Sequence, residues 1–214
     1  MGHKARILAA FWMVGWSFLA HAGGATPKPQ VPVFVSNSAS VAERVVLDAE
    51  RNAGGILHYA GVYVRWVNCG ARASDVSEVQ CREITKTDLV VRVIPHARTF
   101  GDDVFGVSFI DHDAGTYADL FFEPIEQLHE QYKDIALAAI LGDVLAHEIG
   151  HLLLGSNAHS RDGIMQPHWT KEQLYSAAMG RMRFSKEQAA KMRTRIASFQ
   201  IESQNLPTLE ASNR

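Results

Sequence analysis

The chain has 214 residues, 47% of them hydrophobic and 21% charged, with 21 Lys and Arg against 23 Asp and Glu. This length and hydrophobic content suit one globular domain that buries a core of its own. A charge balance so close to neutral predicts no basic surface, so nucleic acid is excluded as the expected partner.

The first 22 residues have the pattern of a secretory signal peptide. Lys4 and Arg6 precede an uncharged run over residues 7–20, and Ala20-His21-Ala22 matches a cleavage site. The run is 14 residues long, which is short for a membrane span, so we expect export and no stable membrane anchor. Residues 23–30 follow as a short linker with Gly and Pro. We therefore expect the mature chain to be secreted, either extracellular or periplasmic, and monomeric.

The next part of the chain predicts a strand, a long helix and then further strands. Ser40 and Glu43 suggest a capping box, and apolar residues recur at helical spacing from Val41 to Ala60. Pro32 lies in the first strand and predicts an early or edge position for it. The strands are expected over residues 31–35, 62–67, 89–94, 104–110 and 117–122.

The chain contains two cysteines, Cys69 and Cys81. Their spacing matches neither a C-x-x-C redox motif nor a zinc ribbon. Because an exported chain meets an oxidising compartment, we expect a disulfide between them.

The longest helical pattern covers residues 134–154 and ends before Gly155, a residue suited to the position after a helix. Two further helices are expected over residues 170–182 and 185–197, the second with a capping box that begins at Ser185. Residues 202–214 form a polar tail.

The helix over residues 134–154 carries an H-E-x-x-H motif made by His147, Glu148 and His151. Histidines four positions apart project from one face of a helix, so both imidazoles can bind one Zn²⁺ ion. The carboxylate of Glu148 is placed to act as general base on the water that a catalytic zinc activates. In an apolar helix, these polar side chains would be costly to bury unless they served a metal.

A catalytic zinc needs a third protein ligand, and the loop after the helix offers His159. Gly155 allows the chain to reverse after the helix, which would bring His159 back over the metal. Asn157 is a poorer zinc donor than an imidazole. A downstream carboxylate, Glu172, is the alternative third ligand.

The motif segment resembles the metzincin metallopeptidases, and among them most nearly the matrixins. The resemblance rests on the motif histidines with Glu148, then Gly155, His159-Ser160 and residues 163–167, Gly-Ile-Met-Gln-Pro. Two departures are clear: Gly155 comes four residues after His151 instead of three, and His159 comes eight after it instead of six. The usual third-ligand position is occupied by Asn157.

The resemblance implies roles for several residues outside the motif. Met165 is similar to the Met-turn methionine under the zinc, and Pro167-His168-Trp169 is similar to the wall of the S1′ pocket. Residues 115–124 resemble the edge strand that holds an extended substrate. The implied substrate-binding residues of that strand are Tyr117, Ala118, Asp119, Leu120 and Phe121.

The resemblance also implies an α/β (α+β) fold: a twisted, mixed five-stranded sheet with two long helices and a small C-terminal subdomain that holds the Met-turn. The catalytic domain would cover residues 31–201, divided into an upper subdomain, 31–155, and a lower one, 156–201. The implied function is a secreted zinc-dependent endopeptidase acting on a protein or peptide substrate. The alternative is a secreted zinc-binding structural or binding protein without turnover.

One catalytic Zn²⁺ is the expected cofactor. His96, His112, Asp113 and His129 could in principle hold a second Zn²⁺, but they match no ligand-spacing motif. A structural Ca²⁺ is likewise without support in the sequence.

Overall fold

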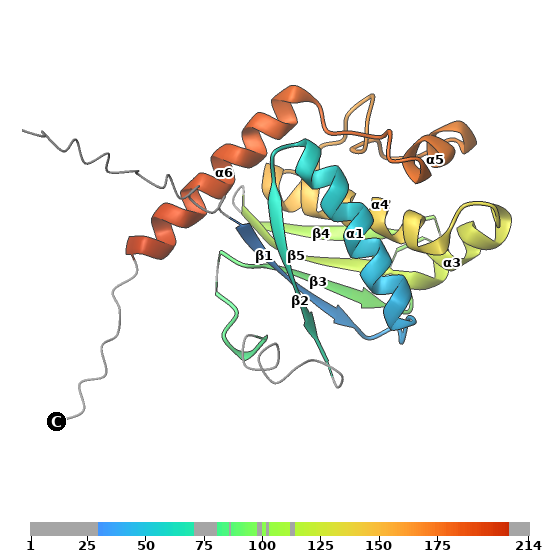
Figure 1. Cartoon of the computed structure of the whole chain (residues 1–214), viewed down its shortest axis with the longest axis horizontal. Helices are drawn as coiled ribbons and strands as arrows, with labels where there is room; N and C mark the ends of the chain where they lie inside the picture. Colours follow the sequence, from blue (N-terminus) through green and yellow to red (C-terminus); the bar gives the residue numbers. More distant parts are fainter. Residues whose placement is uncertain are drawn as a thin grey trace, which may run out of the picture.

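The computed structural model describes residues 30–70, 81–85, 87–97, 100–101, 103–111 and 114–205. The predicted signal peptide and all but the last residue of the predicted linker lie outside this part of the chain. The described residues form one sheet, with α1 (Glu43–Tyr59) and α4 (Leu137–Leu154) packed side by side across one of its faces (Figure 1). The predicted mixed five-stranded sheet is confirmed, and a third long helix, α6 (Lys186–Asn205), joins the two that were expected.

The sheet has five strands, β1 (Gln30–Asn37), β2 (Tyr63–Cys69), β3 (Leu89–Ile94), β4 (Gly106–Asp111) and β5 (Ala114–Phe121). Their order in space is β2-β1-β3-β5-β4. The first four strands of that order are parallel neighbours, whereas β4 runs antiparallel to β5. β4 therefore forms the edge of the sheet nearest α4, which it contacts together with β5.

Neither of the two strands considered for an edge position lies at an edge of the sheet. β1 lies inside the sheet, because its pairing with β3 begins only at Val33 and Pro32 is left outside that ladder. The expected edge strand, residues 115–124, is the interior strand β5, flanked by β3 and β4. The short connection from β4 to β5 makes these two strands antiparallel neighbours, and β5 is the one that also pairs with β3.

The start of α1 also differs from the prediction. The residue before the helix is Ala42, without a side-chain cap, and Ser40 has a φ of 56°. The turn is held instead by Asn37, whose side chain donates to Val41 O at 2.7 Å and accepts from Val41 N at 3.0 Å. Because the N-cap position falls on Ala42, Ser40 lies too early in the chain to cap the helix.

A helix that the sequence analysis did not predict, α3 (Phe122–Gln131), follows β5 directly. Pro124 stands in the first turn of α3, where its missing N–H removes no helical hydrogen bond. The predicted helix over residues 134–154 is therefore shorter at its start and begins as α4 at Leu137.

Helix α4 is the centre of the core. All its residues from Ile140 to Leu154 are buried, so it is enclosed around its whole circumference, as a core helix is. By length and composition it could span a membrane, but 83% of the apolar window is buried inside the domain. Gly142 brings α1 close, because a Cβ at this position would lie 2.7 Å from the carbonyl oxygen of Ala49.

The C-terminal helices α5 (Lys171–Ala178) and α6 (Lys186–Asn205) pack against α4. The predicted capping box at Ser185 is confirmed: its Oγ accepts from Gln188 N at 3.2 Å and its N–H donates to Gln188 Oε1 at 2.8 Å. Helix α6 continues past the predicted start of the polar tail, and residues 206–214 lie outside the described chain.

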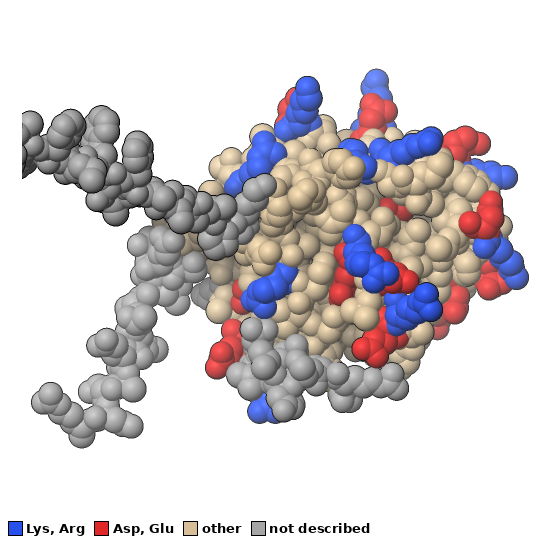
Figure 2. All heavy atoms as spheres, in the orientation of Figure 1, with Lys and Arg blue, Asp and Glu red and all other residues tan. Residues whose placement is uncertain are grey.

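The predicted disulfide is confirmed. Cys69, the last residue of β2, is bonded to Cys81, with their Cα atoms 5.9 Å apart. On the face shown in Figure 2, the basic and acidic side chains intermingle, and neither sign gathers into a patch.

Candidate metal centre

His147 and His151 lie one turn apart on α4 and present their Nε2 atoms to each other at 3.0 Å. The Nδ1 atom of His147 donates to Ile164 O at 2.7 Å, and that of His151 donates to Ser156 O at 2.8 Å. Because a carbonyl oxygen only accepts, these bonds place the proton of each neutral imidazole on Nδ1. Both Nε2 lone pairs are then free for a metal ion, and both rings are held by backbone groups.

His159 joins the pair from the loop after α4. Its ring centroid lies 5.4 Å from that of His147 and 4.9 Å from that of His151. One ligand atom from each of the three histidines lies within 4.8 Å of the others. Glu172, the alternative third ligand, is not part of this cluster, and Asn157 lines the cavity beside it.

The loop that carries His159 is shaped by backbone hydrogen bonds. Gly155 ends α4 with a φ of 61°, a left-handed conformation that suits glycine. Ser156 Oγ then accepts from Ala158 N at 3.1 Å, and Ser160 N donates to Met165 O at 2.8 Å. The chain therefore reverses within a few residues and returns over α4.

The three histidines fit one Zn²⁺ ion. Burial lowers the pKa of His147 to about 3, and it also lowers the pKa of His151 and of His159. All three rings are therefore neutral near pH 7. Neutral imidazole is a preferred ligand of zinc. Three protein ligands leave the fourth position that a catalytic zinc needs for water or substrate.

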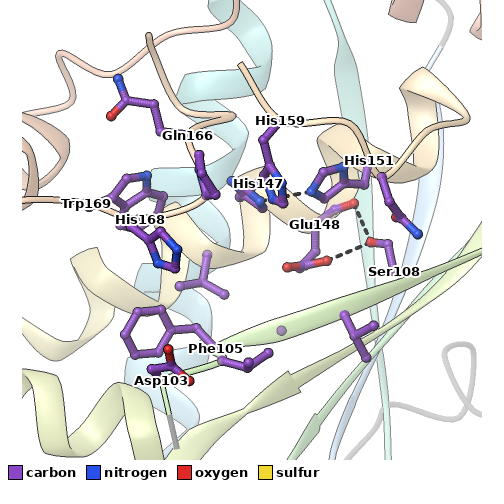
Figure 3. A pocket seen from close by; sticks show the side chains of 16 residues that line it. Asp103, Phe105, Ser108, His147, Glu148, His151, His159, Gln166, His168 and Trp169 are labelled. Atoms are coloured by element: carbon purple, nitrogen blue, oxygen red, sulfur yellow. Dashed lines mark hydrogen bonds between the residues drawn. The ribbon is translucent and has the colours of Figure 1, made fainter. Parts of the chain in front are cut away.

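The carboxylate of Glu148 lies beside this cluster (Figure 3). It is buried, and its Oε2 accepts a hydrogen bond of 2.7 Å from Ser108 Oγ. Burial raises the pKa of Glu148 to about 7, while the bond from Ser108 acts in the opposite direction. A carboxyl group with a pKa near neutrality is suited to take up and release a proton.

The histidines and Glu148 line a cavity of about 410 Å³. One wall is formed by residues 103–108, which include the start of β4, and the opposite wall by residues 166–169. Pro167, His168 and Trp169, expected to border a substrate pocket, all lie in this second wall. The ring of Trp169 stands edge-on to that of His147, with the centroids 6.0 Å apart.

The five residues of β5 that were expected to bind substrate do not line this cavity. Tyr117 and Asp119 take part in a separate cluster with Arg92, whose guanidinium donates two bonds of 2.9 Å to the Asp119 carboxylate. Ala118 and Leu120 are fully buried in the core. The remaining residue, Phe121, is buried and stacks on Phe100. The strand that lines the cavity is β4.

Two residues of β4, Gly106 and Ser108, contact Glu148 and were not identified from the sequence. The sequence offered no local signal for them, because the contact joins residues 40 positions apart. It depends on β4, and not β5, lying at the edge of the sheet.

Met165 is fully buried directly against α4. A Cβ at Gly150 would lie 2.6 Å from the Met165 sulfur and 2.6 Å from the ring of Phe184, so this glycine makes room for both. The turn that holds Met165 is thus packed against the helix segment between the two motif histidines.

The residues considered for a second metal are engaged elsewhere or not described. His129 Nδ1 donates to Ile135 O at 2.8 Å, and His96 lies 3.4 Å from the Glu123 carboxylate. His112 and Asp113 lie outside the described residues. Among the residues that the structure describes, one cluster of potential metal ligands is present, the three histidines around α4.

No family model and no curated protein matches the sequence. Solved structures that the chain resembles include the following two. One is a zinc-dependent peptidase from Methanocorpusculum labreanum, with 16% identity and a TM-score of 0.49, covering 75% of this chain and 99% of that one. The other is an archaemetzincin from Methanopyrus kandleri, with 16% identity and a TM-score of 0.47, covering 78% and 96%. Neither likeness assigns the chain to a family, so its function rests on the residues of the site.

Proposed function

We propose that the chain is a zinc-dependent endopeptidase. The observation that carries the proposal is a buried carboxylate, Glu148, beside three neutral histidines at the wall of a cavity large enough for substrate side chains. A purely structural zinc site would use a fourth protein ligand and would have no need of a base.

When bound, Zn²⁺ supplies Lewis-acid activation of water and of the scissile carbonyl. The residues of the chain supply proton transfer and hold the ligands in place. Glu148 takes the proton of the attacking water on its carboxylate and then delivers it to the nitrogen of the leaving amine. The Nδ1 bonds of His147 and His151 hold both rings in place throughout.

The edge of the sheet supports a peptide as substrate. Within the described residues, β4 pairs with β5 on one side and with no strand on the other, and its first residues line the cavity. An extended peptide can add to such an edge through main-chain hydrogen bonds. Because this mode of binding engages the middle of a chain and needs no terminus, it favours internal cleavage.

The metzincin type, with a matrixin-like Met-turn at Met165, is the finer part of the proposal. It is supported by the burial of Met165 against Gly150 and by the place of residues 167–169 in the cavity wall opposite β4. In this assignment His159 is the third zinc ligand despite its shifted spacing, and residues 156–201 act as the lower subdomain.

Export is a further part of the proposal and rests on the signal-peptide pattern of residues 1–22. The Cys69–Cys81 disulfide is consistent with an oxidising compartment. N-terminal sequencing of the protein from its native host should give a start near Gly23, and a start at Met1 would contradict export.

The experiment that tests the proposed function is digestion of a mixed peptide library by the purified chain, with the products identified by mass spectrometry. We expect internal cleavage by a protein that contains about one zinc per chain. A protein that holds zinc and leaves every peptide intact would favour the alternative, a zinc-binding protein without turnover. Release of single terminal residues would contradict the endopeptidase assignment.

A further inference from the structure

Strand β4 meets Glu148 through two residues that share one face of the strand. Gly106 and Ser108 are two positions apart, so both point to the same side of the sheet. Their partners on β5 are Leu120 and Ala118, which are fully buried. Ser108 is itself buried, with 3% of its surface exposed.

The hydroxyl of Ser108 contacts Glu148 at two points. Its Oγ lies 2.7 Å from the carboxylate Oε2 and 3.0 Å from the main-chain carbonyl oxygen of the same residue. Among the described residues, it is the hydrogen-bond donor that the structure assigns to this carboxylate. The side chain of Ser108 thus contacts both the main chain and the carboxylate of Glu148 (Figure 3).

Gly106 meets the other carboxylate oxygen. A Cβ at this position would lie 2.7 Å from Glu148 Oε1 and 2.8 Å from its Cγ, distances that real Cβ atoms do not adopt. The absent side chain is needed for space, because the carboxylate occupies the volume that a Cβ would fill. Gly106 and Ser108 together fix the position of the Glu148 carboxylate. Its Oε2 is hydrogen-bonded to Ser108, and its Oε1 packs against Gly106.

We propose that Ser108 is a positioning residue for Glu148, and that Gly106 provides the space which makes this position possible. The inference rests on the proposed function, in which Glu148 Oε1 exchanges protons with water and the leaving amine while Oε2 stays on Ser108. The same strand would bind the main chain of the substrate through its free edge. β4 would therefore set the distance between the bound peptide and the base.

The test uses the full zinc-loaded chain and the variants Ser108→Ala, Ser108→Thr and Gly106→Ala. We expect Ser108→Ala to lower kcat by about 10- to 100-fold with little change in KM or zinc content, because it misplaces the base without removing it. Ser108→Thr keeps the hydroxyl and should restore most of the rate. Gly106→Ala should lower kcat at least as much, because it displaces the carboxylate from the opposite side.

Ser36→Ala is the matched control. It makes the same chemical change in β1 of the same sheet, at a position paired with Arg92 and away from the cavity. We expect its kcat, KM and zinc content to equal those of the wild type. A Ser108→Ala variant with kcat within about twofold of this control would overturn the proposal. A loss that Ser108→Thr fails to restore, and that appears equally in KM and zinc content, would also overturn it.

Crystal structures of the wild type and Ser108→Ala give a readout that does not depend on turnover. We expect the Glu148 carboxylate to leave its wild-type position in the variant while the three histidines stay in place. An unmoved carboxylate would overturn the positioning role even if hydrolysis were observed. If the wild type cleaved no peptide but the carboxylate moved in Ser108→Ala, the proposed function would fail and the positioning of Glu148 would stand.

Discussion

Helices α1 and α4, which pack against each other, each bury one glutamate, Glu50 on α1 and Glu148 on α4, and the surroundings of the two carboxylates differ. Burial raises the pKa of both to about 7. Glu148 accepts a 2.7 Å bond from Ser108 and stands beside three histidines. Glu50 accepts a longer bond of 3.4 Å from Asn68, and its other oxygen has no hydrogen-bond partner among the residues that the structure describes. Of the described residues that line the hollow beside it, one is a histidine, His58.

The comparison shows that a raised pKa identifies a buried carboxyl and not a function. Desolvation acts on both groups alike, because it depends only on how much water has been removed. What distinguishes Glu148 is that three potential metal ligands, the histidines of the cluster, line the same cavity as its carboxylate. The difference between the two sites can be tested by three kinds of substitution. These replace a histidine beside Glu148, each of the two glutamates, and the disulfide on the side of Glu50.

The largest effect is expected when the metal ligands around Glu148 are removed. His159→Ala should weaken zinc binding and abolish hydrolysis, because two histidines on one helix are too few ligands to hold a catalytic zinc. Asn157→Ala, the control from the same loop, should leave both properties close to the wild type. Zinc titration against a competing chelator and a peptide assay would measure the two variants together, and the reverse ranking would show that Asn157 supplies the ligand.

Replacing each glutamate by glutamine should then separate the two sites. Glu148→Gln removes the base and should lower kcat by about 10²- to 10⁴-fold, while the zinc content stays near one ion per chain. Glu50→Gln should have the kcat of the wild type, since Glu50 does not line the catalytic cavity. Similar losses in the two variants would mean that burial, and not the histidine cluster, underlies the effect.

The sequence predicted the part of this site that is local in the chain. His147, Glu148 and His151 are related by helical spacing, so their common face follows from the motif alone. His159 could be identified despite its unusual spacing because a zinc site needs a donor from the loop and imidazole is a better donor than the amide of Asn157.

The parts that were missed depend on long-range pairing. In the β4–β5 hairpin, either strand could have joined β3, and the sequence does not say which. Once β5 takes the interior position, Asp119 pairs with Arg92 and Ser108 reaches Glu148 across 40 residues. The start of α1, by contrast, was missed for a local reason, because its N-cap position falls on Ala42 and not on Ser40.

The disulfide gives a smaller effect, confined to the side of the molecule that holds Glu50. Cys69 ends β2 next to Asn68, the residue that donates to Glu50. Replacing Cys69 and Cys81 by serine should lower the free energy of unfolding by about 3 kcal/mol, the chain-entropy value for so short a loop. Denaturant unfolding would measure this, and zinc content and kcat at low temperature should not change. A loss of zinc in this double variant would show that the two sides are coupled.

The smallest effect is a pH-dependent gain in stability from Glu50→Gln. Because the pKa of Glu50 is raised from 4.5 to about 7, the folded chain keeps a proton that the unfolded chain releases between these values. The stability of the wild type therefore falls as the pH rises through this range, and glutamine avoids that loss. We expect the variant to gain about 1 kcal/mol at pH 8, roughly 2–4 °C in Tm.

The gain should disappear below the ordinary pKa of a glutamate, where Glu50 is protonated in both states. Thermal unfolding of wild type and variant at acidic and alkaline pH would show this as two curves that converge on the acid side. A gain of the same size at every pH would mean that packing, and not desolvation of the charge, explains it.

The most direct test of the central claim, that the histidine cluster around Glu148 is a hydrolytic zinc site, is metal removal and reconstitution on the wild-type chain. One peptide from the library digest would be followed before chelation, after chelation and during stepwise addition of Zn²⁺. We expect cleavage to stop when the metal is removed and to return in full at about one equivalent of zinc, as the three-histidine site predicts. Cleavage that survives complete removal of the metal would contradict the account.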